Sequence, residues 1–257
     1  MHMKQLISDV RTMSLRRLKI SIRNLDTILT SVVTPSLMMI LFVYVLGGSM
    51  HVEGMSYVNY IVPGILIQCI GQCGSNTAIA INNDIKSGII HRFYTMPIMK
   101  SSILLGHIIE AFFRSIVTTM IILGIAYIVG FRPDMQVHNM LLIILLLAMF
   151  ILMISWMSIL FGLLAQGPEG AGACAVFISI LPYLSSGFVS VDSMPVALAV
   201  FAKYQPMTPI IDSLRALFMG EVFYIQEYLL GMMWCVVFIV ICFGLSQVLF
   251  KRKLQTS

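Results

Sequence analysis

The sequence predicts an all-α integral membrane protein with six transmembrane helices. Hydrophobic residues make up 59% of the 257 residues and charged residues only 11%, whereas a soluble domain usually carries about 25% charged residues. Six runs stay apolar over the roughly 20 residues that a helix needs to cross a bilayer. They are too long and too uniformly apolar for the alternating strands of a membrane barrel. The expected spans are residues 28–48, 57–81, 101–131, 139–165, 170–191 and 228–250.

Before the first span, residues 4–26 are expected to form an amphipathic helix on the membrane surface. Leu15, Leu18 and Ile22 recur at helical spacing, and basic residues that begin with Arg16 form the adjoining stripe. Two interpretations of this helix remain open. In the first, its charges only set the topology of the chain. In the second, it is an elbow helix that also contacts a partner.

The basic residues predict the orientation of the chain. Twelve of the 16 Lys and Arg residues precede the first span, join the second span to the third, or follow the last span. Because basic loops favour the cytoplasmic side, both termini are expected in the cytoplasm of a multi-pass protein of the plasma (inner) membrane. The net charge of +5 then faces anionic membrane lipid and leaves little reason to expect nucleic-acid binding.

Residues 84–95 are a polar and basic interlude between the second and third spans. Apolar residues recur there every four positions, charged residues lie around the rest of the turn, and Pro97 ends the element. The residues concerned are Asp84, Ile85, Lys86, Gly88, Ile89, Arg92 and Phe93. The pattern predicts a short amphipathic helix that projects into the cytoplasm and is suited to docking on another protein.

Two ionisable residues lie inside the third expected span. Glu110 and Arg114 are four residues apart, so they share a helix face and can form an ion pair. Charged groups are costly inside a membrane and often mark a transport pathway or a structural contact. Both interpretations remain open, as does snorkelling of the two side chains towards water.

The segment 192–227 is too apolar for an ordinary loop, yet Pro195, Pro206 and Pro209 interrupt it. It is expected to fold back as short re-entrant or interfacial helices on the outer side, with Arg215 among them.

No motif of an enzyme is present. The sequence lacks the phosphate loop G-x-x-x-x-G-K-[ST], the metalloprotease motif H-E-x-x-H and the nucleophile elbow G-x-S-x-G. The five histidines are scattered, and the five cysteines all fall within expected spans. We therefore expect no catalytic site, no metal site and no directly bound cofactor.

Two stretches resemble the permease subunits of ABC-2 type exporters, and within them the daunorubicin-resistance type. The first is "GIIHRFYTMPIMKSSILLGHIIEAFFR", and the second is "LPYLSSGFVSVDSMPVALAVFAKYQPMTPIIDSLRALFMG". In the first, the positions that match are Gly88, Arg92, Phe93, Met96, Pro97, Gly106, Glu110 and Arg114. The chain departs from the pattern at His91, where that subgroup often has an acidic residue.

The resemblance implies a function and partners. The segment 84–95 would be a coupling helix seated on a separately encoded ABC ATPase, which binds the ATP. Two permeases and two ATPases would form an exporter for an amphipathic drug or a lipid-like molecule. The alternative that the residues themselves leave open is an ion-coupled secondary carrier, for which Glu110 is the only acidic residue well inside a span.

Overall fold

A computed structural model describes residues 2–47, 55–89, 101–220 and 223–255, and these residues form helices and connecting turns without a strand. The all-α prediction is confirmed. The principal helices are α1 (His2–Arg23), α2 (Leu25–Leu41), α3 (Tyr57–Lys86), α5 (Ser101–Val129), α6 (Val137–Leu164), α7 (Pro168–Ile180), α8 (Val196–Tyr204), α9 (Met207–Met219) and α10 (Ile225–Gln255). Short turns of other helix types lie at η1 (Phe42–Leu46), η2 (Leu181–Leu184) and η3 (Val191–Ser193).

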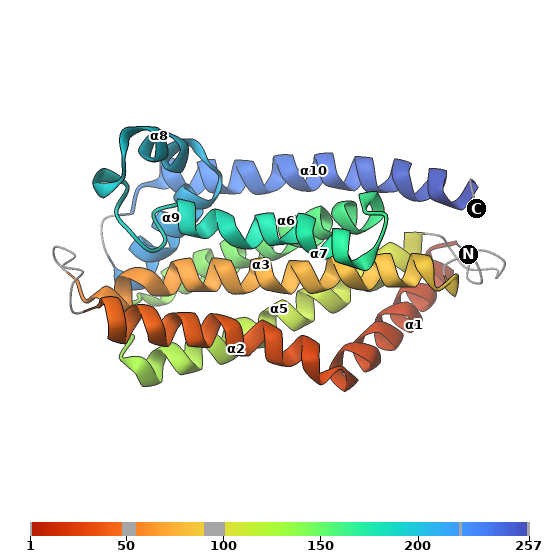
Figure 1. The fold of residues 1–257 in the computed structure, drawn as a ribbon, viewed down its shortest axis with the longest axis horizontal. Coiled ribbons are helices and arrows are strands. Elements are labelled where there is room, and N and C mark those ends of the chain that lie inside the picture. Colours follow the sequence, from red (N-terminus) through yellow and green to blue (C-terminus); the bar gives the residue numbers. More distant parts are fainter. Residues whose placement is uncertain (1, 48–54, 90–100, 221–222, 256–257) are drawn as a thin grey trace.

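Helix α3 is the centre of the bundle. It packs against α2, α5, α6, α7 and α9 (Figure 1). Most of its residues are buried, including Ile61, Ile65 and Leu66 at no measurable exposure. Small residues allow its neighbours to approach closely. A Cβ atom at Gly162 of α6, for example, would lie 2.5 Å from the carbonyl oxygen of Ala78.

The chain bends sharply between α1 and α2 (Figure 1). Asn24 has an extended conformation, and its side chain accepts a hydrogen bond from the backbone N–H of Thr27 at 3.4 Å. An N-cap of this kind starts a new helix. The first helix therefore ends at Arg23, and the expected single helix over residues 4–26 is corrected to α1 and the beginning of α2.

Four described helices are long and apolar enough to cross a membrane: Tyr57–Lys86, Ser101–Val129, Val137–Leu164 and Ile225–Lys253. Two shorter apolar helices cover Leu29–Val45 and Pro168–Leu184. The helix Pro168–Leu184 is shorter than the expected span 170–191. After Leu184 the Ser185 hydroxyl donates to the Pro182 carbonyl at 2.5 Å and accepts from the Gly187 N–H at 3.1 Å. These contacts end the helix at Leu184.

The segment after α7 folds into two short helices at one end of the bundle. Pro195 precedes α8 and Pro206 precedes α9, while Pro209 lies in the first turn of α9, where a missing N–H is tolerated. Helix α9 packs on α3, α6 and α10. Both termini lie at the opposite end of the bundle (Figure 1).

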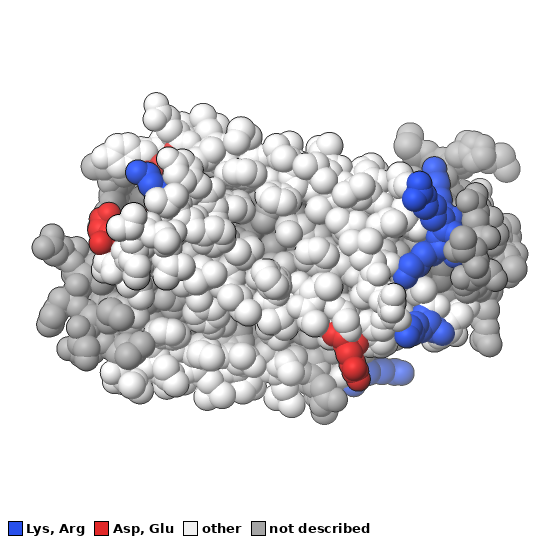
Figure 2. Space-filling model, turned by 45° about the horizontal axis from the view of Figure 1, so that its top comes forward, with Lys and Arg blue, Asp and Glu red and all other residues white. Residues whose placement is uncertain are grey.

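Charged side chains are concentrated at the ends of the molecule. Figure 2 shows Lys and Arg gathered at the end that holds both termini, while the long middle of this face carries almost none. The exposed basic residues at that end include Lys86 at the end of α3 and Lys251 and Arg252 in α10. A broad uncharged band between polar ends is the pattern expected for a bilayer-spanning bundle.

Replacing Gly64 by alanine is expected to lower the free energy of unfolding by about 1–3 kcal/mol, as overpacking does in cores. A Cβ atom there would lie 2.5 Å from the carbonyl oxygen of Gly187, so two stretches of backbone would have to separate. Thermal unfolding of the detergent-purified protein measures the change.

Gly124→Ala in α5 is the matched control, because a Cβ atom there meets no described heavy atom within 4 Å. It should be neutral or stabilising by about 0.5–1 kcal/mol. Equal effects of the two substitutions would refute the close contact at Gly64.

Candidate functional site

The segment expected to couple to a partner begins inside α3. The helix continues without a break to Lys86, Ser87 caps it, and Gly88 then adopts a φ of +70°. This left-handed conformation favours glycine and turns the chain out of the helix. Asp84, Ile85 and Lys86 therefore belong to α3, which differs from the separate helix expected over residues 84–95.

The described part of this segment ends at Ile89. Arg92, Phe93 and Pro97 lie outside the described residues. Lys86 is exposed. Its Nζ would lie 3.4 Å from a Cβ atom placed at Gly167, so Lys86 stands next to the turn between α6 and α7. The end of α3 thus presents a cation beside a second turn at the basic end of the molecule.

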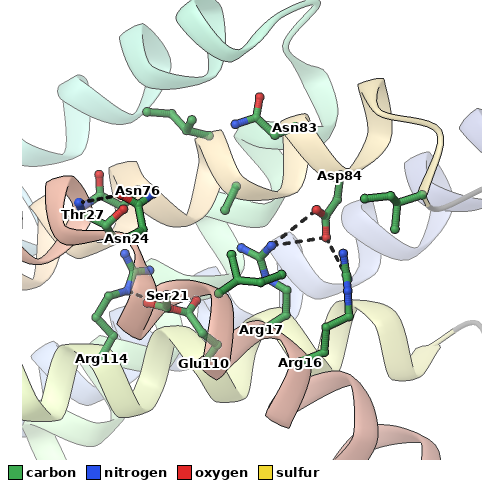
Figure 3. A pocket seen from close by; sticks show the side chains of 14 residues that line it. Arg16, Arg17, Ser21, Asn24, Thr27, Asn76, Asn83, Asp84, Glu110 and Arg114 are labelled. Carbon is green, nitrogen blue, oxygen red and sulfur yellow. Dashed lines mark hydrogen bonds and ion pairs between the residues drawn. The ribbon is translucent and has the colours of Figure 1, made fainter.

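Asp84 is buried where three helices meet. Its carboxylate lies 3.4 Å from Nη1 of Arg16 and 3.4 Å from Nη1 of Arg17, both in α1 (Figure 3). On the other side, Nε2 of His107 in α5 lies 3.2 Å away. One carboxylate thus links α3 to both α1 and α5.

The contact of α1 with α5 is close at the same level. A Cβ atom at Gly106 would lie 2.8 Å from Cβ of Met13, so only glycine permits the observed distance. Burial lowers the pKa of the Arg17 guanidinium, and the carboxylates of Asp84 and Glu110 act in the opposite direction. The two carboxylates therefore stabilise the charged form of Arg17.

Glu110 and Arg114 form a second ion pair on α5. Nε of Arg114 lies 3.0 Å from Oε1 of Glu110, and its Nη2 donates to the Thr77 hydroxyl of α3 at 2.6 Å. Both side chains are buried: that of Arg114 is 9% exposed and that of Glu110 is 2% exposed. The pair lines a cavity of about 280 Å³ together with Arg16, Arg17 and Asp84 (Figure 3).

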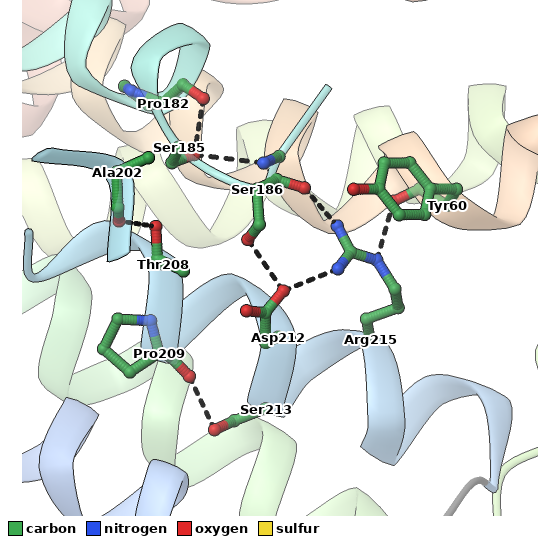
Figure 4. A network of polar contacts seen from close by, with 11 residues as sticks. Tyr60, Pro182, Ser185, Ser186, Ala202, Thr208, Pro209, Asp212, Ser213 and Arg215 are labelled. Atoms are coloured by element: carbon green, nitrogen blue, oxygen red, sulfur yellow. Dashed lines mark hydrogen bonds and ion pairs between the residues drawn. The ribbon is translucent and has the colours of Figure 1, made fainter. Parts of the chain in front are cut away.

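A second polar network lies near the opposite end, around Arg215 of α9 (Figure 4). Its guanidinium donates to the carbonyl oxygens of Tyr60 at 3.2 Å and Ser186 at 2.6 Å, and pairs with Asp212 at 2.6 Å. It also lies 3.8 Å from the centre of the Tyr60 ring. The Ser186 hydroxyl donates to Asp212 at 2.7 Å, which closes the network.

These arrangements join helices through buried polar contacts. Across the described ranges, no group of three or more His, Cys, Asp or Glu side chains is placed to hold a metal ion. The contacts of Asp84 with Arg17 and His107, and of Arg215 with Tyr60, were not predicted from the sequence. A signal was present in the adjacent Arg16 and Arg17, two basic residues next to each other on an amphipathic helix.

The long apolar helices, the buried ion pairs and the charged ends define a multi-pass membrane protein. The model of the ABC-2 type transporter family matches residues 8–219, and the chain belongs to that family.

Individual relatives have modest identity. The chain is 25% identical over 190 residues to the daunorubicin resistance ABC transporter permease protein DrrB1 of Streptomyces coeruleorubidus, covering 74% of this chain and 67% of that protein. It is 26% identical over 205 residues to the probable doxorubicin resistance ABC transporter permease protein DrrC of Mycobacterium tuberculosis, covering 77% and 72%. It is 24% identical over 229 residues to the inner membrane transport permease YadH of Escherichia coli, covering 86% and 88%. The resemblance inferred from the two sequence stretches is confirmed.

Proposed function

We propose that this chain is the membrane permease subunit of an ATP-driven ABC exporter. The observation that carries the proposal is the family match over residues 8–219, which includes all the helices from α2 to α9. The family implies a separate ABC ATPase as partner, and the chain has no phosphate loop of its own. The relatives with drug-resistance names support export as the direction of transport.

The finer parts of the proposal concern assembly and substrate. Two copies of the chain pair with two ATPase subunits in the plasma (inner) membrane, with both termini in the cytoplasm. The basic end that holds the termini supports this orientation. The path between the two permeases carries an amphipathic drug or a lipid-like molecule. The six spans comprise the four long helices and the two shorter apolar ones.

The contacts of Asp84 support a route for coupling to ATP. Closure of the ATPase subunits displaces the end of α3, where the segment 84–95 begins. Because Asp84 is paired with Arg17 of α1 and lies beside His107 of α5, the three helices move together. ATP drives transport because it binds one of the two conformations more tightly than the other.

An ion-coupled secondary carrier is less well supported. Such a carrier needs ionisable or carbonyl groups available to the coupling ion near the middle of the membrane. Glu110 is the acidic residue inside an expected span, and its Oε1 is already paired with Arg114 at 3.0 Å. The family match favours the exporter.

The test is gentle extraction of the tagged protein from native membranes, followed by mass spectrometry of the proteins that remain bound. We expect an ABC ATPase in stoichiometric amount. We expect Lys86 to face an acidic group of the ATPase. Lys86→Glu should then reduce the recovered ATPase, and ATP-dependent efflux, by more than about tenfold, since like charges across an interface cost several kcal/mol.

Lys203→Glu is the matched control, because Lys203 is exposed on α8 at the other end of the molecule. It should leave both measurements unchanged. Absence of any ATPase from a folded preparation, together with efflux that survives ATP depletion, would replace the exporter with an ion-coupled carrier.

A further inference from the structure

Two residues that line the cavity beside the Asp84 and Glu110 ion pairs carry polar atoms that the protein does not satisfy. Oε2 of Glu110 and Nε of Arg17 are buried and have no hydrogen-bond partner among the described residues. Both residues line the cavity, and Glu110 is 1% exposed while Arg17 is 7% exposed. Buried polar atoms without partners are costly, so a bound group is expected to supply the missing hydrogen-bond partners. That group must offer an acceptor to Arg17 and a donor to Glu110.

The charges around the cavity define this group more closely. Three guanidinium groups and two carboxylates line it: those of Arg16, Arg17 and Arg114, and of Asp84 and Glu110. A guanidinium matches the oxygens of a phosphate, and a carboxylate matches an ammonium. A headgroup that carries one phosphate and one amine therefore complements the two unsatisfied atoms and the mixed lining.

An apolar cavity adjoins the polar one. It also has a volume of about 280 Å³ and shares Ser21 and Arg114 with the polar cavity. Its other lining is almost entirely apolar and comes from α1, α2 and α5, with Leu18, Val32 and Phe113 among the residues. A third hollow of about 530 Å³ shares Leu18 and Phe113 with it and continues along α1 and α5.

These apolar hollows face outward. Phe113 is 52% exposed and Val117 is 56% exposed on α5. In a membrane these side chains would contact hydrocarbon, and a hollow between them is filled by an acyl chain at little cost. The polar cavity and the apolar hollows are neighbours, because each shares lining residues with the next, and together they offer a polar site beside an apolar one, as an amphipathic molecule requires.

We propose that these hollows form a binding site for one aminophospholipid, such as phosphatidylethanolamine. The phosphate lies beside Arg17, the amine beside Oε2 of Glu110, and an acyl chain follows the apolar hollows between α1 and α5. The site holds a resident membrane lipid in the angle between α1 and α2, distinct from a transported molecule. This inference does not rest on the proposed function, because lipid binding is measured without transport.

The first test uses the full-length protein purified in detergent and stripped of lipid. Native mass spectrometry and thermal unfolding are recorded with phosphatidylethanolamine, phosphatidylglycerol, diacylglycerol or inorganic phosphate. A ligand that binds the folded state raises the unfolding temperature. We expect one retained phosphatidylethanolamine and the largest shift with that lipid.

Each other outcome overturns the site as proposed. An equal shift with phosphatidylglycerol removes the assignment of the amine to Glu110, and an equal shift with inorganic phosphate removes the acyl chain. An equal shift with diacylglycerol removes the phosphate. No retained lipid and no shift mean that the cavity holds water.

Two variants locate the site. Ser21→Phe places a ring at the junction of the polar and apolar cavities and should weaken phosphatidylethanolamine binding about ten- to a hundredfold, the equivalent of one lost charged hydrogen bond. Glu110→Gln keeps the side-chain volume and should abolish the preference for phosphatidylethanolamine over phosphatidylglycerol. Thr12→Phe is the matched control, because Thr12 is exposed on α1 and lines none of the three hollows. If Thr12→Phe weakens binding as much as Ser21→Phe does, the site lies elsewhere.

Discussion

Asp84→Asn is expected to destabilise the protein by about 3–5 kcal/mol, the usual cost of breaking a buried ion pair by removing one partner. The substitution leaves the Arg17 guanidinium buried at 8% side-chain exposure without its carboxylate. It also removes the group that faces His107 at 3.2 Å. Fluorescence-detected thermal unfolding in detergent measures the loss.

Two further variants distinguish this explanation from a general effect of removing an acidic residue. Asp134→Asn, at an exposed position in the turn between α5 and α6, should leave stability unchanged within about 0.5 kcal/mol. The double variant Asp84→Leu with Arg17→Met should recover part of the lost stability, because an apolar pair of similar size replaces the ions. A double variant that is less stable than Asp84→Asn would contradict the argument.

Arg215→Met should cost about 3 kcal/mol or more, because a buried network of charged hydrogen bonds is then left without its donor. The carbonyl oxygens of Tyr60 and Ser186 lose their partner, and Asp212 loses its counter-charge. Arg215→Lys should recover only part of the stability, since an ammonium cannot reproduce the planar fork of a guanidinium. The same thermal unfolding assay should rank the unchanged protein as most stable, then Arg215→Lys, then Arg215→Met.

Lys203→Met on α8 is the control for Arg215→Met, because it removes an exposed cation from a neighbouring element. It is expected to be neutral within about 0.5 kcal/mol. If Arg215→Met is equally neutral, the network around Tyr60 and Asp212 does not hold α9 against α3.

The helical architecture was predictable because membrane spans are encoded locally. An apolar run that faces lipid must satisfy its own backbone hydrogen bonds, and in a segment of this length that favours a helix. Helix ends were less predictable. The end of the second span was expected at Ile81, because Asn82 and Asp84 are polar, yet the helix continues to Lys86. It can do so because its neighbours satisfy these side chains. The Asn82 amide, for example, donates to the carbonyl oxygens of Gly162 and Ala165 at 2.9 Å each.

The polar contacts were less predictable than the helices. Glu110 and Arg114 are four residues apart, so helix geometry alone brings them together. Arg17 and Asp84 are 67 residues apart in sequence and Tyr60 and Arg215 are 155 apart, so only the packing of the helices reveals these contacts. For the same reason Asp84 was expected on an exposed docking surface, whereas it lies at the junction of α1, α3 and α5.

Helix α1 begins, and α10 ends, at the same pole of the bundle (Figure 1). A soluble domain joined by a short linker to either terminus would therefore reach the same face of the protein. Gene fusion in either order would therefore place the added domain at the same end of the helical bundle, with the bundle itself unchanged.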